Sequence, residues 1–247
     1  LTIGGEVLRV ENLSHKSLFH NVNFTVHAGE VLGVSGLMGA GRTEIMQAIF
    51  GNLPVVEGKI FIDGAEVKIH NTRDAIHAGI GFITEDRKTE GLLLDKSIAQ
   101  NIELANLDRV SNRGVISNAK RNTLVKQGIE EFRIRCFNAD QECGSLSGGN
   151  QQKVVIAKWV YKQPKILILD EPTRGVDIGA KKEIYNIINQ LAAQGVAIIL
   201  VSSELPEVLG MSDRIMVVCE GRVTGIVNAA EADQAKIMTL ATGGNIA

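Results

Sequence analysis

The chain has 247 residues, which is enough for one large domain or two small ones. Its apolar content of 45% is sufficient for a sizeable core. Its 26 basic residues nearly balance its 28 acidic ones. This balance disfavours partners bound by charge alone, such as nucleic acid or an acidic membrane surface.

Three cysteines, Cys136, Cys143 and Cys219, form neither a paired framework nor a metal-ligand spacing. We therefore expect free, buried thiols in a reducing compartment. The apolar run at 196–201 is far too short to span a membrane, and residues 1–6 lack the features of a secretory signal. The missing initiator methionine suggests a segment of a longer chain, and any contact with a membrane is expected to go through a partner.

Short strands and one helix are expected in the first third. Apolar and polar residues alternate in most strand segments, and Asp63-Gly64 supplies a hairpin turn. Residues 31–34 are wholly apolar, as in a strand that a parallel sheet buries on both faces. The expected strands are 6–10, 22–26, 31–34, 59–63 and 66–69. The helix follows a glycine-rich loop, with Ile45, Ala48 and Ile49 at helical spacing.

The middle of the chain, from about residue 89 to 162, contains no strong strand. Residues 95–107 and 118–133 are expected to be helical, with a polar loop at 108–114 between them. The last third alternates again, which favours an α/β fold with a parallel sheet and the helical middle as an inserted subdomain. There we expect strands at 166–169, 197–202, 214–219 and 222–227, a helix at 178–193 and a weak C-terminal helix.

The segment 36–43 fits the phosphate-binding pattern G-x4-G-K-[ST] at every fixed position except the lysine. Gly36, Gly39 and Gly41 allow successive N–H groups to point at phosphate oxygens, and a helix begins directly afterwards. Thr43 is placed to offer its hydroxyl to Mg²⁺. Arg42 keeps the positive charge of the lysine, but its guanidinium is bulky and donates in a fixed fork. We therefore expect nucleotide binding and doubt efficient turnover. A glycine-rich turn without ligand is the alternative.

An apolar strand at 166–169 delivers two carboxylates, Asp170 and Glu171, at its carboxyl end, where ligands bind in open α/β sheets. Asp170 would hold Mg²⁺, and Glu171 would orient or deprotonate an attacking water. An acidic pair that only caps the next turn is the alternative for either residue alone.

The octapeptide at 146–153, Leu-Ser-Gly-Gly-Asn-Gln-Gln-Lys, opens a helix that continues through Trp159. The Ser147 hydroxyl, two glycines and the helix N-terminus form a second anion site by the same physics as the first loop. One nucleotide does not need two such cradles. We therefore predict that each works in a different site, shared between two domains.

Across nearly all 247 residues the chain resembles the nucleotide-binding domains of ABC transporters. It is similar in particular to the second half of the tandem ATPase subunits of ribose/galactose/xylose-type importers. The segments that carry the resemblance are 36–44, 85–88, 170–177 and 202–209. It implies a P-loop (RecA-like) core over 1–88 and 156–247, with an antiparallel β subdomain, and an α-helical signature subdomain over about 89–155.

In that family two domains pack head to tail, and each ATP lies between the P-loop of one domain and the signature of the other. The resemblance therefore implies ATP and Mg²⁺ as cofactors, and it makes Glu171 the catalytic carboxylate. The implied metal ligands are Thr43, Asp170 and Glu85. The implied nucleotide-binding residues are Gly36, Leu37, Met38, Gly39, Ala40, Gly41, Arg42, Thr43, Glu44, Glu85, Ser147, Gly148, Gly149, Asn150, Gln151, Asp177 and Ser203.

The implied partners are the N-terminal half of the same tandem subunit, membrane permease subunits and, indirectly, a periplasmic or extracellular sugar-binding protein. No nucleic acid is expected. The resemblance places the chain on the cytoplasmic face of the membrane as a peripheral subunit, docked through residues near 85–105. Ribose is the sugar expected, with galactose and xylose close behind.

The chain departs from the family pattern at four places on one side of the nucleotide. Arg42 replaces the lysine, Glu85 stands where a glutamine usually senses the γ-phosphate, and Ser203 replaces the switch histidine. Around Leu13 and Ser14 there is no aromatic residue to stack on adenine. Together these predict a degenerate own site beside an intact signature that serves the partner half, although Glu171 has no obvious place in a retired site.

Three functions remain open from the sequence. The first is an ATPase half that powers sugar import within the full assembly. The second is a non-hydrolysing regulatory half that binds nucleotide and completes the partner's site. The third is a soluble ABC-type ATPase acting on nucleic acid or ribosomes, which the balanced charge and the lack of basic stripes disfavour.

Overall fold

The chain folds as two units, seen in a computed structural model that describes residues 2–245. The first unit comprises the described residues up to Phe82, the segment Lys165–Glu171 and the described residues from Ile188 onwards. The second comprises Ile83–Pro164 and Pro172–Ile187. The chain thus leaves the first unit and returns to it twice.

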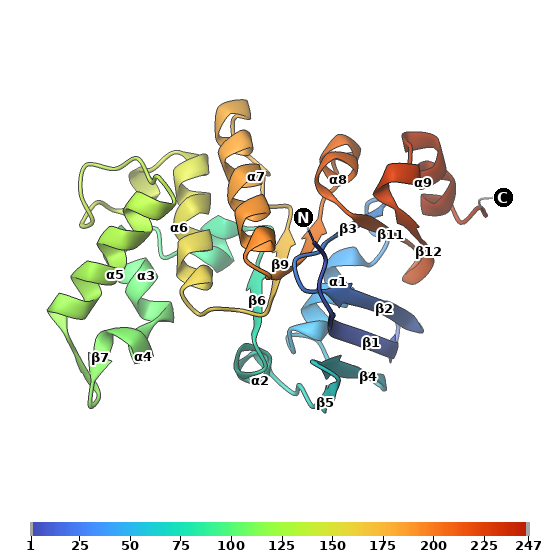
Figure 1. Cartoon of the computed structure of the whole chain (residues 1–247), viewed down its shortest axis with the longest axis horizontal. Helices are drawn as coiled ribbons and strands as arrows, with labels where there is room; N and C mark the ends of the chain where they lie inside the picture. The colour runs from blue at the N-terminus through green and yellow to red at the C-terminus, as the bar shows by residue number, and fades with distance from the viewer. Residues whose placement is uncertain (1, 246–247) are drawn as a thin grey trace. The chain divides into compact units, whose positions relative to one another are not determined.

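The first unit is built on a six-stranded sheet with the strand order β12-β11-β3-β10-β9-β6 (Figure 1). β3 pairs in parallel with both β10 and β11, and β10 pairs in parallel with β9, whereas β11 and β12 form an antiparallel hairpin. Every residue of β9 and β10 is buried, because their unbroken apolar runs suit strands covered on both faces. The strands are β3 (Val31–Gly36), β6 (Ile80–Ile83), β9 (Ile166–Asp170), β10 (Ala197–Val201), β11 (Arg214–Cys219) and β12 (Arg222–Asn228).

A second sheet of the first unit is antiparallel, with the order β2-β1-β4-β5. Asp63 and Gly64 both have positive φ angles, of 50° and 79°, in the tight turn between β4 and β5. The alternation of apolar and polar residues places one face of this sheet in the core. Its strands are β1 (Glu6–Ser14), β2 (Val22–His27), β4 (Glu57–Ile62) and β5 (Ala65–Val67).

Helices of the first unit present apolar faces to its core. α1 (Arg42–Ile49) buries Ile45, Met46, Ala48 and Ile49. α8 and α9 contribute to an apolar cluster with β11, in which Val208, Ile215 and Ile237 are fully buried. The remaining helices are α2 (Thr72–His77), α8 (Leu205–Met211), the 3₁₀ turn Ala229–Glu231 and α9 (Gln234–Ala241).

The second unit is mainly helical (Figure 1). α3 packs against both α5 and α6, and a short hairpin of β7 and β8 follows α4. α7 (Ile178–Ala193) begins in this unit and ends in the first. The other elements are the π-helix η1 (Arg87–Gly91), α3 (Ile98–Ala105), α4 (Leu107–Val110), β7 (Ser111–Asn112), β8 (Val115–Ile116), α5 (Asn118–Glu131), the 3₁₀ turn η2 (Cys143–Ser145) and α6 (Gly148–Val160).

The predicted fold class is confirmed: a mixed α/β architecture with a parallel core sheet, an antiparallel sheet and a helical part. Two expectations about elements are wrong. The first third holds a second helix, α2, whose start is capped by the Asn71 side chain. The predicted loop at 108–114 contains most of α4 and the β7 strand of the hairpin. The three cysteines are free, as expected, but only Cys143 is buried; Cys136 and Cys219 are partly exposed, so the expectation of buried thiols is wrong for these two. None of the described helices is long and apolar enough to cross a membrane.

Candidate functional site

The predicted phosphate loop lies in the first unit, between the end of β3 and the start of α1. Gly36 has no room for a side chain, because a Cβ atom there would lie 2.4 Å from the Val218 carbonyl oxygen. Gly41 has a φ of 101° and is the N-cap of α1, which no side chain caps. The first N–H groups of α1 are therefore available to an anion, and the partial positive charge of the helix start favours one.

The middle of the phosphate loop is exposed, and its end is buried and hydrogen-bonded to another segment. Leu37, Met38 and Gly39 are exposed, whereas Ala40 is buried. The Ala40 carbonyl accepts a backbone hydrogen bond from Gly221 N at 2.7 Å. This contact fastens the loop to the turn between β11 and β12.

Arg42 is held by the end of a neighbouring strand. Its Nη1 donates to the Ser202 carbonyl oxygen at 2.8 Å, directly after β10. The guanidinium therefore extends along the carboxyl end of the sheet. Burial raises the pKa values of Asp170 and Glu171, and the positive charge of Arg42 opposes this increase.

Asp170 closes β9 and is 1% exposed. Neither of its carboxylate oxygens has a hydrogen-bond partner of good geometry among the residues that the structure describes. Burial raises the pKa of Asp170 to about 6, and the nearby Thr43 hydroxyl only partly offsets this. A buried carboxylate without a partner is costly, and most such groups in proteins hold a ligand, water or ion.

Glu171 follows Asp170 with a φ of 48°, in the left-handed region that non-glycine residues rarely adopt. Its amide donates to the Val201 carbonyl at 2.8 Å, and its Oε2 accepts from the Ser203 hydroxyl at 3.2 Å. Burial raises the pKa of Glu171, and the Ser203 hydrogen bond opposes the shift. Ser203, at the predicted switch position, therefore contacts the predicted catalytic carboxylate directly.

The residues at this edge of the sheet fit a magnesium ion. Asp170 offers two hard oxygen atoms without partners, and the Thr43 hydroxyl lies near them at the start of α1. Mg²⁺ in phosphate sites takes few protein ligands and completes its shell with water and phosphate oxygens. The first unit thus brings together the phosphate loop, Thr43, Asp170, Glu171 and Ser203.

The signature segment lies in the second unit and caps α6. Ser147 is the N-cap, and its hydroxyl accepts from the Asn150 amide N–H at 3.4 Å and from Asn150 Nδ2 at 2.9 Å. Gly149 has no space for a side chain, because a Cβ atom would lie 2.4 Å from Ala180 Cβ. Gln151 is 5% exposed, and its Nε2 donates to the Cys143 carbonyl.

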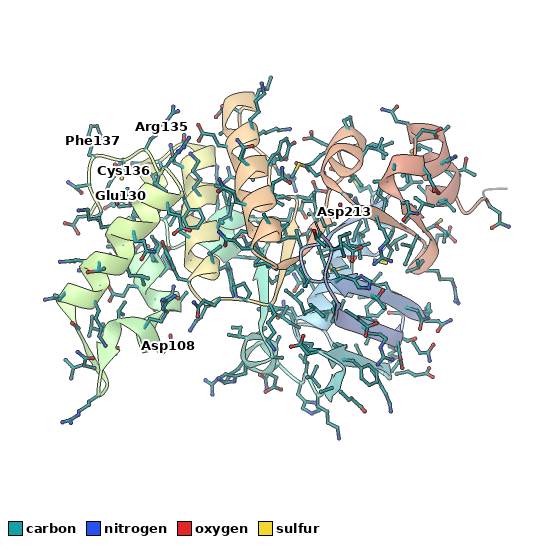
Figure 2. The ribbon with its side chains drawn as sticks, in the orientation of Figure 1. Asp108, Glu130, Arg135, Cys136, Phe137 and Asp213 are labelled. Carbon is teal, nitrogen blue, oxygen red and sulfur yellow. The ribbon has the colours of Figure 1, made fainter. Side chains whose placement is uncertain are left out.

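Asp177 lies beside the signature segment. Its Oδ1 accepts from Ala180 N at 3.0 Å and so caps the first turn of α7. Signature and α7 residues line one pocket, together with Lys153, whose buried ammonium pairs with Glu183. Arg135 also lines this pocket, from the loop between α5 and α6 on which Figure 2 labels Arg135, Cys136 and Phe137.

Glu85 lies in the second unit as well, where its carboxylate forms an ion pair with Arg174. The predicted site residues therefore fall into two groups. The first unit holds Gly36, Leu37, Met38, Gly39, Ala40, Gly41, Arg42, Thr43, Glu44, Asp170, Glu171 and Ser203. The second unit holds Glu85, Ser147, Gly148, Gly149, Asn150, Gln151 and Asp177.

Two further residues make contacts that the sequence patterns do not indicate. Ser202 receives Arg42 through its backbone carbonyl, and no sequence signal marks a carbonyl as an acceptor. Arg87 is buried and donates to the Arg174 carbonyl at 2.7 Å. Its place in the sequence, two residues after Glu85, is the feature that could have indicated it.

Comparison with known proteins agrees with this arrangement. The family model described as ABC transporter matches residues 19–174, more than half of the chain. The chain is 58% identical over 245 residues to the Ribose import ATP-binding protein RbsA of Geobacillus kaustophilus, covering 99% of this chain and 50% of that protein. It is 55% identical over 243 residues to the protein of the same name in Bacillus subtilis, covering 98% and 49%. The chain thus spans about half the length of the curated relatives it matches.

Solved structures share the fold. An ATP-binding cassette of an ABC transporter in its ADP conformation matches with a TM-score of 0.77 at 21% identity, covering 96% of this chain and 95% of that one. A dimeric cassette in a post-hydrolysis state, bound to ADP and Pi, matches with a TM-score of 0.76 at 21% identity, covering 90% and 98%. The family match and the fold together establish that this chain belongs to the ABC transporter family, as one of its ATP-binding domains.

Proposed function

We propose that this chain is the ATP-binding domain of a ribose importer and couples ATP binding and hydrolysis in the assembled transporter to sugar uptake. The names of the relatives at 58% and 55% identity support ribose. Their double length supports a tandem subunit of which this chain is one half. The permease and a sugar-binding protein complete the assembly, which holds this domain at the cytoplasmic face of the membrane.

The first unit binds Mg-ATP. Residues 36–44 hold the phosphates through the backbone N–H groups of the loop and of α1. Thr43 and Asp170 hold Mg²⁺, which neutralises charge on the phosphate oxygens when bound. The observation that carries this proposal is the buried Asp170 carboxylate at the end of β9, which has no hydrogen-bond partner of good geometry among the described residues.

Turnover at this domain's own site is weak or absent. Arg42 donates to the Ser202 carbonyl, so part of its hydrogen-bonding capacity is taken by the protein. Ser203 bonds Glu171, and a neutral hydroxyl does not stabilise the charge of a transition state as an imidazolium would. Losing one well-aimed donor typically lowers kcat by about 100- to 1000-fold.

The signature in the second unit completes the partner half's site. Ser147, Gly148 and Gly149 start a 13-residue helix whose N-terminus favours an anion. The carboxylate of Glu85 is occupied by its ion pair with Arg174. The Glu85 segment, near 85–105, is also where we place the contact with the permease.

A regulatory half that binds nucleotide without hydrolysing it is the second candidate. The contact between Arg42 and Ser202 favours it, because this contact leaves binding possible and removes a donor from the reacting phosphate. The two candidates differ only in whether the own site turns over.

Calorimetric titration of the purified chain with ATP, with and without Mg²⁺, tests the proposal. We expect Mg-dependent binding in the micromolar range and its loss in Asp170→Ala. Glu171→Gln is the matched control, which keeps a similar shape and should still bind. The absence of binding at millimolar ATP would overturn the own site and leave a signature donor only. ATP hydrolysis by the chain that disappears in Glu171→Gln would exclude the regulatory candidate.

A further inference from the structure

Arg87 is a buried arginine that the functional assignment leaves unexplained. It begins η1, two residues after Glu85, and is 9% exposed. Its Nε donates to Gln151 Oε1 at 3.3 Å, its Nη1 to the Arg174 carbonyl at 2.7 Å and its Nη2 to the Gly175 carbonyl at 3.3 Å. One planar group therefore joins three segments that are far apart in the sequence.

All three of these acceptors are neutral. Burial lowers the pKa of Arg87, and the negative charge of the adjacent Asp86 opposes this shift. A buried charge is expensive unless it is well bonded, so a charge without an acceptor carboxylate is a poor device for stability alone. What the guanidinium offers here is geometry, because its donors point in fixed directions within one plane.

The space between this guanidinium and the start of the signature is too small for a side chain. A Cβ atom at Gly148 would lie 2.6 Å from both Arg87 Nη2 and the Gly175 carbonyl. The signature start and the segment after Pro172 therefore approach each other as closely as their backbones allow. Gln151 extends the connection, since its Nε2 donates to the Cys143 carbonyl at 3.1 Å in front of the signature.

A second link joins the same segments. The side chain of Arg174 pairs with Glu85, while its carbonyl accepts from Arg87. The segment 85–87 thus contacts Arg174 twice, through an ion pair with its side chain and a hydrogen bond to its backbone carbonyl. Glu85 and Arg87 together therefore connect this segment to the residues before Asp177 and, through Gln151, to the signature.

We propose that Arg87 is a positioning residue that sets the spacing between the signature segment 147–151 and the segment 174–177. The inference rests on the proposed function, in which these two segments complete the nucleotide site of the partner half. Lysine has a single nitrogen on a flexible stem and does not reproduce the three-way contact.

The first test measures amide hydrogen exchange of the purified chain by mass spectrometry. In Arg87→Lys, exchange in peptides covering 147–153 and 173–180 should accelerate by about tenfold, as expected for lost hydrogen bonds of a buried charged group. Arg109→Met is the matched control. Arg109, which lies on α4, also donates to a backbone carbonyl, that of Tyr161, which lies outside the signature. Gln151→Leu removes the acceptor of the Arg87 Nε hydrogen bond, and it serves as the second test variant if Arg87→Lys does not fold. Unchanged exchange of both peptides in folded Arg87→Lys or Gln151→Leu overturns the inference.

The second test measures ATP turnover by the tandem subunit assembled with its permease. A displacement of about 1 Å at a reacting centre costs about 100-fold in rate. We therefore expect Arg87→Lys to lower kcat by about this factor while KM changes by less than about threefold. Ser147→Arg, which blocks the signature, separates the two proposals. If Ser147→Arg leaves turnover intact, the proposed function fails. If Ser147→Arg stops turnover and Arg87→Lys does not, only the positioning role of Arg87 is overturned.

Discussion

Asp170 is the residue that points most strongly to a bound ligand, because its buried oxygens have no hydrogen-bond partner of good geometry among the described residues. Between its ordinary pKa of 3.8 and the folded value of about 6, the folded chain holds a proton that the unfolded chain has released. The free energy of unfolding therefore falls as pH rises through this window, and the full penalty remains above it.

We predict that Asp170→Asn raises the free energy of unfolding by roughly 3 kcal/mol near neutral pH without Mg²⁺. The gain should shrink as pH falls through about 6 and vanish below the ordinary aspartate pKa. Urea unfolding at a series of pH values measures it. A gain that is constant with pH would trace the effect to packing instead of ionisation. The same protonation should weaken Mg-ATP binding below about pH 6, because the metal requires the carboxylate.

Arg42 allows a second test at the residue scale. Arg42→Lys removes the donation to the Ser202 carbonyl and returns a compact charge to the loop. We expect Mg-ATP to bind about tenfold more tightly, the scale of one hydrogen bond to a charged group. Arg42→Met should bind more weakly than the unaltered chain. Calorimetry compares the three, and a lysine variant weaker than the arginine form would show that the guanidinium itself reaches the nucleotide.

The sequence was sufficient to name candidate site residues, but not to predict their contacts. Spacing alone indicated Thr43, Asp170 and Glu171, because the phosphate loop and the strand-end carboxylates have fixed local patterns. The bond from Arg42 to Ser202 joins residues 160 apart in the sequence and ends on a carbonyl, which every residue possesses. The pairing of Glu85 with Arg174 likewise depends on how distant segments pack.

At the scale of elements, a glycine-to-alanine substitution should have opposite effects on stability at two places. One glycine lies where two backbones approach closely, and the other lies on an open helix surface. Gly148→Ala places a Cβ atom 2.6 Å from the Gly175 carbonyl, and overpacking of this kind costs about 1–3 kcal/mol. Gly210→Ala, within α8, meets nothing within 4 Å and should stabilise the chain by about 0.5–1 kcal/mol through helix propensity. Chemical denaturation of both variants checks the contrast. Equal effects would show that the signature start relaxes freely.

The elements that were missed are short. α2 and α8 have six and seven residues, too few to show a helical period. Signals for both exist: Asn71 caps α2, and Pro206 lies in the first turn of α8. β6 has only four residues, all buried, which is too short for a strand pattern in the sequence; its pairing with β9 identifies it as a strand. The longer elements, such as α7 with its stripe of Ile184, Ile188 and Leu191, followed from periodicity.

At the scale of the whole molecule, the division into two units predicts where nucleotide acts. Mg-ATP added to the isolated chain should slow amide exchange in peptides covering 36–44 and 170–171, which belong to the first unit. Exchange around 147–153 in the second unit should stay unchanged, because in the proposed function that segment serves a site on another domain. Hydrogen exchange with mass spectrometry provides the measurement, and Asp170→Ala the negative control. Protection of both regions at once would indicate nucleotide-driven pairing of two copies of this chain.

The backbone at Glu171 carries a further consequence. Asp63 and Glu220, which also have positive φ angles, lie in hairpin turns, whereas Glu171 directly follows a fully buried central strand. A side chain in this conformation costs about 1 kcal/mol that glycine would not. The chain thus keeps a carboxylate where its own backbone is better suited to glycine. Strain of this kind is typical of groups held for their chemistry, so this backbone conformation supports the catalytic role that we propose for Glu171.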